Sequence, residues 1–219
     1  MDARPSRTVL IAGATGLVGR EILQGLLADD SVAAVHSLAR RELPLRHPKL
    51  IQHRVDFSKA LPTLPRVGEG FIALGTTIKV AGSQEAFRAV DFDAVIDVAR
   101  AAKAAGATRL GVVSAMGADP RSRIFYNRVK GETEEALAGL GFDTLVIARP
   151  SFLVGDRKAL GQPERGGEKL ALRVSNWLAP LIPDNYRSVD AGAVARALLK
   201  AVPASSGQRV MPSSELRRI

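Results

Sequence analysis

A glycine-rich turn between an apolar run and an amphipathic stretch constrains this chain more than any other feature. Residues 8–12 (TVLIA) have the length and composition of a buried strand, and residues 17–27 carry apolar side chains at helical spacing. In a strand–turn–helix unit, such glycines allow a tight turn, close approach of the backbone to a pyrophosphate, and close helix–strand packing. The helix N-terminus adds free N–H groups for the phosphates. A dinucleotide-binding loop with the spacing G-x-x-G-x-x-G is therefore predicted at Gly13, Ala14, Thr15, Gly16, Leu17, Val18 and Gly19.

The rest of the chain alternates short β-branched runs with helical stretches. Ser83 suits the N-cap of a long alanine-rich helix that ends at Gly106, and another helix is expected over about 122–139. This alternation predicts an α/β fold with a doubly wound parallel sheet, the Rossmann arrangement. Further strands are expected over 33–38, 50–55, 70–74, 109–114 and 144–148.

The alternation of strands and helices ends after Pro150. Residues 151–167 are rich in glycine, proline and charged side chains, which indicates a long loop. A helix over 190–202 and a last strand over 209–211 are expected beyond it. We therefore expect residues 1–150 to form the nucleotide-binding core, and residues 151–219 to form a small lid or substrate-binding segment packed on the same domain. A short amphipathic helix is predicted from the helical spacing of Leu170, Val174, Trp177, Leu178 and Leu181.

Composition narrows the function classes. The chain has no cysteine, which excludes disulfides, thiolate metal sites and a cysteine nucleophile, and its three histidines lack metal-ligand spacing. The net charge of +9 is spread along the chain with few aromatics, which favours attraction for an anionic cofactor over nucleic-acid binding. No apolar signal core and no apolar run of about 20 residues is present, so we expect a cytoplasmic protein without a membrane partner. A homodimer contact through Trp177 stays open.

The type of dinucleotide is read about 20 residues after the glycine loop, where an acidic residue would bind the ribose hydroxyls of NAD. Here the second strand leads into Arg40 and Arg41, and no acid appears before Glu42. Either arginine could pair with the 2′-phosphate of NADP, although both could equally be solvated. NADP is therefore the predicted cofactor, with NAD as the alternative.

A serine, a tyrosine and a lysine form a candidate catalytic set. Tyr126 and Lys130 lie four residues apart on one helical face, and Ser114 ends the strand before that helix. Transfer of hydride to a carbonyl needs a proton donor for the oxygen, and an adjacent ammonium stabilises a tyrosine phenolate. Tyr126 would be the general acid/base, Lys130 its electrostatic partner, and Ser114 a hydrogen-bond partner of the substrate oxygen. A surface tyrosine beside a lysine is the structural alternative.

Together, GATGLVG, the strand-ending serine and YNRVK resemble the short-chain dehydrogenase/reductase superfamily in its extended or atypical branch. A closer resemblance, carried by ALGTT, AVDFDAV, SAMGAD, VKGETE and ARPSFLVGDR, is to atypical members of the Tat-interacting oxidoreductase type. That resemblance implies cofactor contacts from Leu74, Gly75 and Thr76, from Asp56 near the adenine, and from Pro150 and Ser151 near the nicotinamide. Asp56 could instead cap a turn, and the region after Pro150 is small for a sugar-nucleotide epimerase.

Two functions follow from these residues. The first is an NADP-dependent reductase or dehydrogenase that transfers hydride between the nicotinamide and a small carbonyl or alcohol substrate. The second is an NADP-binding sensor or scaffold with little or no turnover. The Ser, Tyr and Lys set favours the enzyme.

Overall fold

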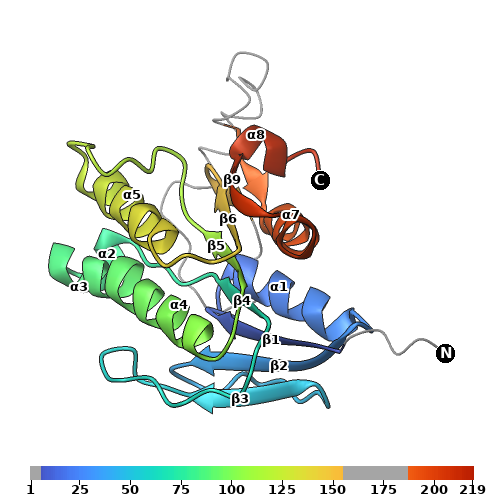
Figure 1. Cartoon of the computed structure of the whole chain (residues 1–219). Coiled ribbons are helices and arrows are strands. Elements are labelled where there is room, and N and C mark those ends of the chain that lie inside the picture. Colours follow the sequence, from blue (N-terminus) through green and yellow to red (C-terminus); the bar gives the residue numbers. More distant parts are fainter. Residues whose placement is uncertain (1–5, 155–186) are drawn as a thin grey trace.

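Parallel strands form the central sheet of the computed structural model, which describes residues 6–154 and 187–219. The strand order is β3-β2-β1-β4-β5-β6-β9, and each neighbouring pair is parallel (Figure 1). This topology confirms the predicted doubly wound α/β fold. The strands of this sheet are β1 (Arg7–Ala12), β2 (Val32–Ala39), β3 (Leu50–Arg54), β4 (Glu69–Ile72), β5 (Arg109–Val113), β6 (Thr144–Arg149) and β9 (Gly207–Pro212).

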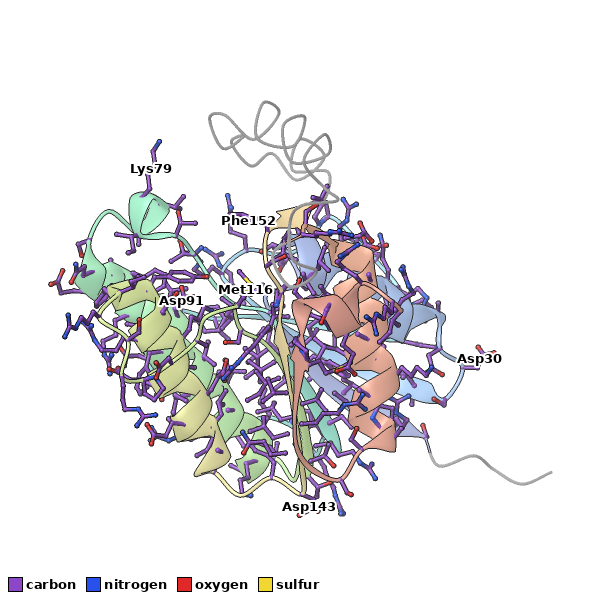
Figure 2. The ribbon with its side chains drawn as sticks, turned by 90° about the horizontal axis from the view of Figure 1, so that it is seen from above. Asp30, Lys79, Asp91, Met116, Asp143 and Phe152 are labelled. Carbon is purple, nitrogen blue, oxygen red and sulfur yellow. The ribbon has the colours of Figure 1, made fainter. Side chains whose placement is uncertain are left out.

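Helices cover both faces of the sheet (Figures 1 and 2). On one face α1 (Leu17–Ala28) packs beside α7 (Ala191–Ala204), and on the other α4 (Ala94–Ala104) lies beside α5 (Phe125–Ala138). The strand order reverses at β1, which pairs with β2 on one side and β4 on the other. Ligands of open parallel sheets bind in the crevice at such a switch point, outside the carboxyl ends of the strands.

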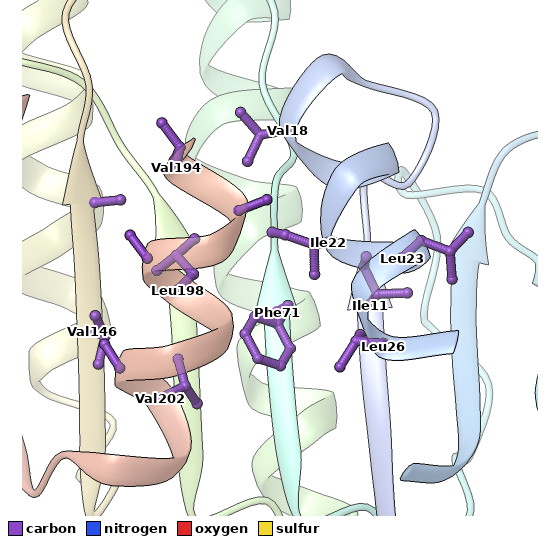
Figure 3. Packing of buried hydrophobic residues seen from close by; sticks show 14 of the residues in the cluster. Ile11, Val18, Ile22, Leu23, Leu26, Phe71, Val146, Val194, Leu198 and Val202 are labelled. Atoms are coloured by element: carbon purple, nitrogen blue, oxygen red, sulfur yellow. The ribbon is translucent and has the colours of Figure 1, made fainter. Parts of the chain in front are cut away.

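The core is divided by the sheet into two apolar layers. Figure 3 shows the layer beneath α1 and α7, where Ile22 of α1 and Leu198 and Val202 of α7 surround Phe71 of β4. All four side chains are fully buried. Burial of each such side chain contributes about 1.5–3 kcal/mol. Because helices cover both faces, the central strands are apolar at successive positions, as the run TVLIA indicates.

The long helix expected between Ser83 and Gly106 is interrupted. The Ser83 hydroxyl accepts a hydrogen bond from the Ala86 N–H, as an N-cap should, and Gly106 adopts a φ of 96° just beyond the last turn. Between these ends, α3 (Gln84–Arg88) is joined to α4 by a π-helical turn, η1 (Ala89–Asp93). Such turns occur frequently at functional sites. The sequence also did not predict α2 (Ile78–Ala81), a single turn.

The C-terminal residues complete the same core. A small second sheet pairs β7 (Leu153–Val154) with β8 (Val189–Asp190), and Asp190 caps α7 by accepting from the Ala193 N–H. β9 lies beside β6 as the seventh strand of the main sheet, and α8 (Ser213–Leu216) follows it. The predicted amphipathic helix and most of the loop before it lie outside the described residues. Within the described ranges, no helix has both the length and the hydropathy needed to span a membrane.

Candidate functional site

Two glycines of the loop after β1 are required by packing. Gly13 has a φ of 92°, and a Cβ atom there would lie 2.4 Å from the Ala73 carbonyl oxygen at the end of β4. A Cβ atom on Gly19 would lie 2.1 Å from the carbonyl oxygen of Gly13. Side chains at these two positions would therefore push the loop away from β4 and α1 away from the loop.

Gly16 differs, because packing tolerates a side chain there. Its nearest neighbour would be the Gly13 carbonyl oxygen, 3.4 Å from an added Cβ atom. Gly16 is the N-cap of α1, where no side chain caps the helix and no acid occupies the first turn. The N–H groups at this helix end therefore keep their positive potential for an anion. The bare backbone at Gly16 fits a phosphate that comes close to the loop.

Arg40 and Arg41 extend the chain beyond the carboxyl end of β2, and both are exposed. Neither makes an ion pair with a carboxylate among the described residues. The loop that they begin is held by Gln52 of β3, whose side-chain oxygen accepts from the Leu43 N–H at 2.7 Å. Both guanidinium charges thus follow the carboxyl end of β2 without a carboxylate partner among the described residues.

Asp56, just beyond β3, holds a turn. Its Oδ1 accepts from the Ser58 N–H at 3.0 Å and from the Ser58 hydroxyl at 2.7 Å. These bonds lower the pKa of the exposed Asp56 carboxyl. The structure therefore shows the turn-capping alternative for this residue, and a contact with adenine stays a prediction.

Leu74, Gly75 and Thr76 follow the carboxyl end of β4, at the switch point beside the glycine loop. Pro150 and Ser151 follow β6 at the same edge. The hydroxyl of Ser151 donates to the Arg187 carbonyl oxygen and accepts from the Ser213 hydroxyl at 2.9 Å. Ser151 thus ties the end of β6 to the C-terminal residues.

Ser114 stands just after β5, and its hydroxyl is engaged from within the protein. It donates to Oε1 of Glu134, on α5, at 2.5 Å. Arg149, the last residue of β6, holds the same carboxylate through Nε at 3.1 Å from each oxygen and Nη2 at 2.5 Å from Oε2. A carboxylate that is bound by a guanidinium acts as a hydrogen-bond acceptor, so the Ser114 hydroxyl supplies the hydrogen in its bond to Glu134.

Lys130 also has a buried acidic partner. Its Nζ lies 2.7 Å from Oδ1 of Asp91 in η1, and the two groups form a buried ion pair. Burial alone would lower the pKa of Lys130, but Asp91, helped by Tyr126 and Glu134, raises it above its ordinary value. Tyr126 lies one turn earlier on α5, and its ring centroid is 5.4 Å from that of Phe87.

The structure thus groups Tyr126, Lys130 and Glu134 on successive turns of α5 and brings Ser114 to the same edge of the sheet. The sequence analysis did not identify Asp91, Glu134 or Arg149. A signal for the acids exists, because Asp91 precedes Val95 and Val98 on the buried stripe of its helix. Glu134 shares the buried stripe of α5 with Leu137. An acid on an apolar stripe indicates a buried partner. No metal-binding group of three or more His, Cys, Asp or Glu occurs in residues 6–154 and 187–219.

Two curated relatives match most of the chain. Protein FMP52, mitochondrial, from Coccidioides immitis is 35% identical over 209 residues, which are 89% of this chain and 85% of the relative. Protein HTATIP2 from Rattus norvegicus is 35% identical over 213 residues, covering 93% of this chain and 84% of the relative. No family model matches the chain. Among solved structures, MoeE5 in complex with UDP-glucose and NAD superposes with a TM-score of 0.70 at 19% identity, covering 93% of this chain and 75% of that chain.

The relatives correct one expectation from the sequence. FMP52 proteins from several fungi are named mitochondrial, which contradicts the cytoplasmic location expected above. That expectation was wrong because it depended on the lack of an apolar signal core. Mitochondrial addresses are amphipathic and rich in arginine and serine, so the lack of an apolar core says nothing about them.

Proposed function

The chain belongs to the atypical short-chain dehydrogenase/reductases of the HTATIP2 and FMP52 type, and from this membership we propose that it is an NADP-dependent oxidoreductase. Its fold is that of nucleotide-dependent oxidoreductases and epimerases. The substrate in this proposal is a small carbonyl compound or the corresponding alcohol. Bound NADP would supply the hydride acceptor or donor, and the residues of the chain would handle orientation and the proton.

The observation that carries the proposal is the uncapped N-terminus of α1 at the sheet's switch point. Packing requires glycine at positions 13 and 19, whereas it would tolerate a side chain at Gly16. The helix end also lacks a side-chain cap and an acid in its first turn. A pyrophosphate would satisfy these N–H groups and the helix dipole together. This supports a dinucleotide lying across β1 and β4.

The preference for NADP over NAD follows from the charge beyond β2. Arg40 and Arg41 are exposed there and form no ion pair with a described carboxylate. An acid that would favour the ribose hydroxyls of NAD is missing before Glu42. A 2′-phosphate would give either guanidinium a bidentate partner.

The proton chemistry falls to Tyr126, Lys130 and Ser114. Tyr126 would donate its hydroxyl proton to the substrate oxygen during reduction and recover it during oxidation, with the Lys130 ammonium stabilising the phenolate in between. In this structure the Ser114 hydroxyl donates to Glu134. To donate to the substrate oxygen, as expected from the sequence, Ser114 would first have to release that carboxylate.

The test begins with binding. NADPH and NADH are titrated into the full chain while nicotinamide fluorescence is followed. We expect NADPH to bind at least tenfold more tightly, and Arg40→Ala or Arg41→Ala to reduce that ratio without weakening NADH. Arg46→Ala, an exposed arginine later in the same loop, is the matched control and should leave the ratio unchanged. Failure of both nucleotides to bind would overturn the proposal.

Turnover is tested next with a panel of small aldehydes, ketones and alcohols. Tyr126→Phe should lose at least 100-fold in kcat, in the range that general acid–base catalysis contributes, and should keep its affinity for NADPH. Binding of NADPH without turnover of any compound by the wild type would instead support the sensor or scaffold alternative.

A further inference from the structure

Asp91 is a carboxylate inside the protein that joins three separate parts of the candidate site. It lies at the middle of the π-helical turn η1 and is fully buried. Its Oδ2 accepts from the Thr76 N–H at 2.8 Å, and its Oδ1 lies 2.7 Å from Nζ of Lys130. Figure 2 shows Asp91 within the molecule, whereas Lys79 of the nearby α2 points outward. One side chain thus connects η1, the loop after β4 and α5.

The surroundings keep this carboxylate in place. The Thr133 hydroxyl on α5 lies 2.7 Å from the carbonyl oxygen of Val129 on its own helix and 3.0 Å from that of Asp91, so its hydrogen is shared between α5 and the backbone of η1. Gly75, in the loop after β4, places bare backbone beside the ion pair. A Cβ atom on Gly75 would lie 3.4 Å from Asp91 Oδ1 and 3.8 Å from Lys130 Nζ. The loop predicted to touch the cofactor therefore lies directly against the carboxylate and the ammonium.

The charge of Lys130 depends on this arrangement. An ammonium without a counter-ion is costly inside a protein, and a buried lysine tends to lose its proton instead. Lys130 is only 6% exposed. The groups that act on it electrostatically are Asp91 from η1 and Tyr126 and Glu134 from its own helix. Asp91 is the nearest of the acids and makes the only ion pair of Lys130 with a described residue.

We propose that Asp91 is a positioning residue that keeps Lys130 protonated and fixes its ammonium beneath the loop at residues 74–76. The importance of this for catalysis rests on the proposed function, because Lys130 acts there on Tyr126. The charge state of Lys130 itself can be tested without nucleotide or substrate. The two proposals can therefore fail separately.

The experiment is a pH titration of the full chain labelled with [13Cε]lysine and followed by NMR. The Lys130 signal is identified by its loss in Lys130→Arg. In the wild type we expect Lys130 to stay protonated after exposed lysines such as Lys59 and Lys79 have reached their midpoints. In Asp91→Asn the midpoint of Lys130 should fall by at least one pH unit, a tenfold weaker hold on the proton. Circular dichroism at each pH shows that the fold persists.

Asp97→Asn is the matched control. Asp97 lies further along the same helical run, where its side chain is half exposed and pairs with Arg100. This substitution removes the same charge and should leave the Lys130 midpoint unchanged. A folded Asp91→Asn with the wild-type midpoint would overturn the proposal. If that variant does not fold, the wild type decides alone, because a Lys130 midpoint at or below those of the exposed lysines overturns it too.

Discussion

The Ser114 hydroxyl and the Glu134 carboxylate are joined by a buried hydrogen bond of 2.5 Å. Arg149 donates to both oxygens of the same carboxylate. The cluster joins the end of β5, the middle of α5 and the end of β6, so it fixes the edge of the sheet on which the candidate site is built.

Replacement of Glu134 by glutamine tests how much this cluster stabilises the fold. Glu134→Gln keeps the size of the side chain but leaves Arg149 without its counter-ion. We expect unfolding by urea to show a loss of roughly 2–4 kcal/mol, somewhat below the cost of breaking a fully buried pair because Arg149 is partly exposed. The neighbouring Glu135 is exposed, so Glu135→Gln should stay within about 0.5 kcal/mol of the wild type. Equal stability of the two variants would contradict a structural role for the cluster.

Substitution of Gly16 by serine should separate stability from binding. The φ and ψ of Gly16 are −85° and 170°, which serine adopts readily, and serine is a better N-cap than glycine. The free energy of unfolding should therefore stay equal or rise by a few tenths of a kcal/mol. The new side chain would occupy the place of a phosphate, so NADPH affinity should fall at least tenfold in the fluorescence titration. Unchanged affinity would mean that the nucleotide does not approach this residue.

Substitution of Gly13 by alanine should destabilise the protein even without nucleotide. Gly13 and Gly82 have nearly the same φ, 92° and 88°, but a Cβ atom on Gly82 meets nothing within 4 Å. Gly82→Ala should cost only the backbone strain, about 1 kcal/mol. Gly13→Ala adds the collision with Ala73 and should cost at least about 2 kcal/mol more. Urea unfolding of both variants checks this difference, and equal losses would show that the loop can move away from β4.

Acidification should weaken the fold through His36. Nδ1 of His36 lies 2.9 Å from Nε2 of His53, and burial together with His53 lowers the pKa of His36. The unfolded chain then takes up a proton below about pH 6.5 while the folded chain resists it, so stability falls as the pH drops through that value. His36→Gln removes this titration and should lose less in Tm between about pH 7 and 5 than the wild type. If His36→Gln loses as much Tm as the wild type over this range, another group is responsible.

The architecture could be predicted because its signals are local. The run TVLIA before Gly13, Ser83 as a cap and Gly106 as a helix end each act within a few residues. The sequence therefore indicated the alternating strands and helices, and with them the parallel sheet. Interruption of the long helix by η1 was not predictable, because its residues fit the helical pattern on both sides.

The partners of the candidate catalytic residues could not be predicted for a different reason. Glu134 is 20 residues from Ser114 in sequence, and Lys130 is 39 residues from Asp91. These contacts arise from the order of the strands and the packing of α5 against η1, and periodicity carries no information about either. As a result, the sequence indicated Ser114 at the end of its strand and Lys130 on the following helix, but it gave no sign that Glu134 and Asp91 are their partners.

The π-helical turn also has a consequence for how such a site can change by insertion or deletion. A π turn holds one residue more than the α-helical turn it replaces, and each residue of an α-helix turns the chain by about 100°. Deletion of Phe92 or Asp93, which follow Asp91 in η1, would let the segment rewind as continuous α-helix. It would also rotate Asp91 by about 100° relative to α4. The carboxylate would then point away from Lys130, so a single codon lost just after Asp91 would abolish that contact.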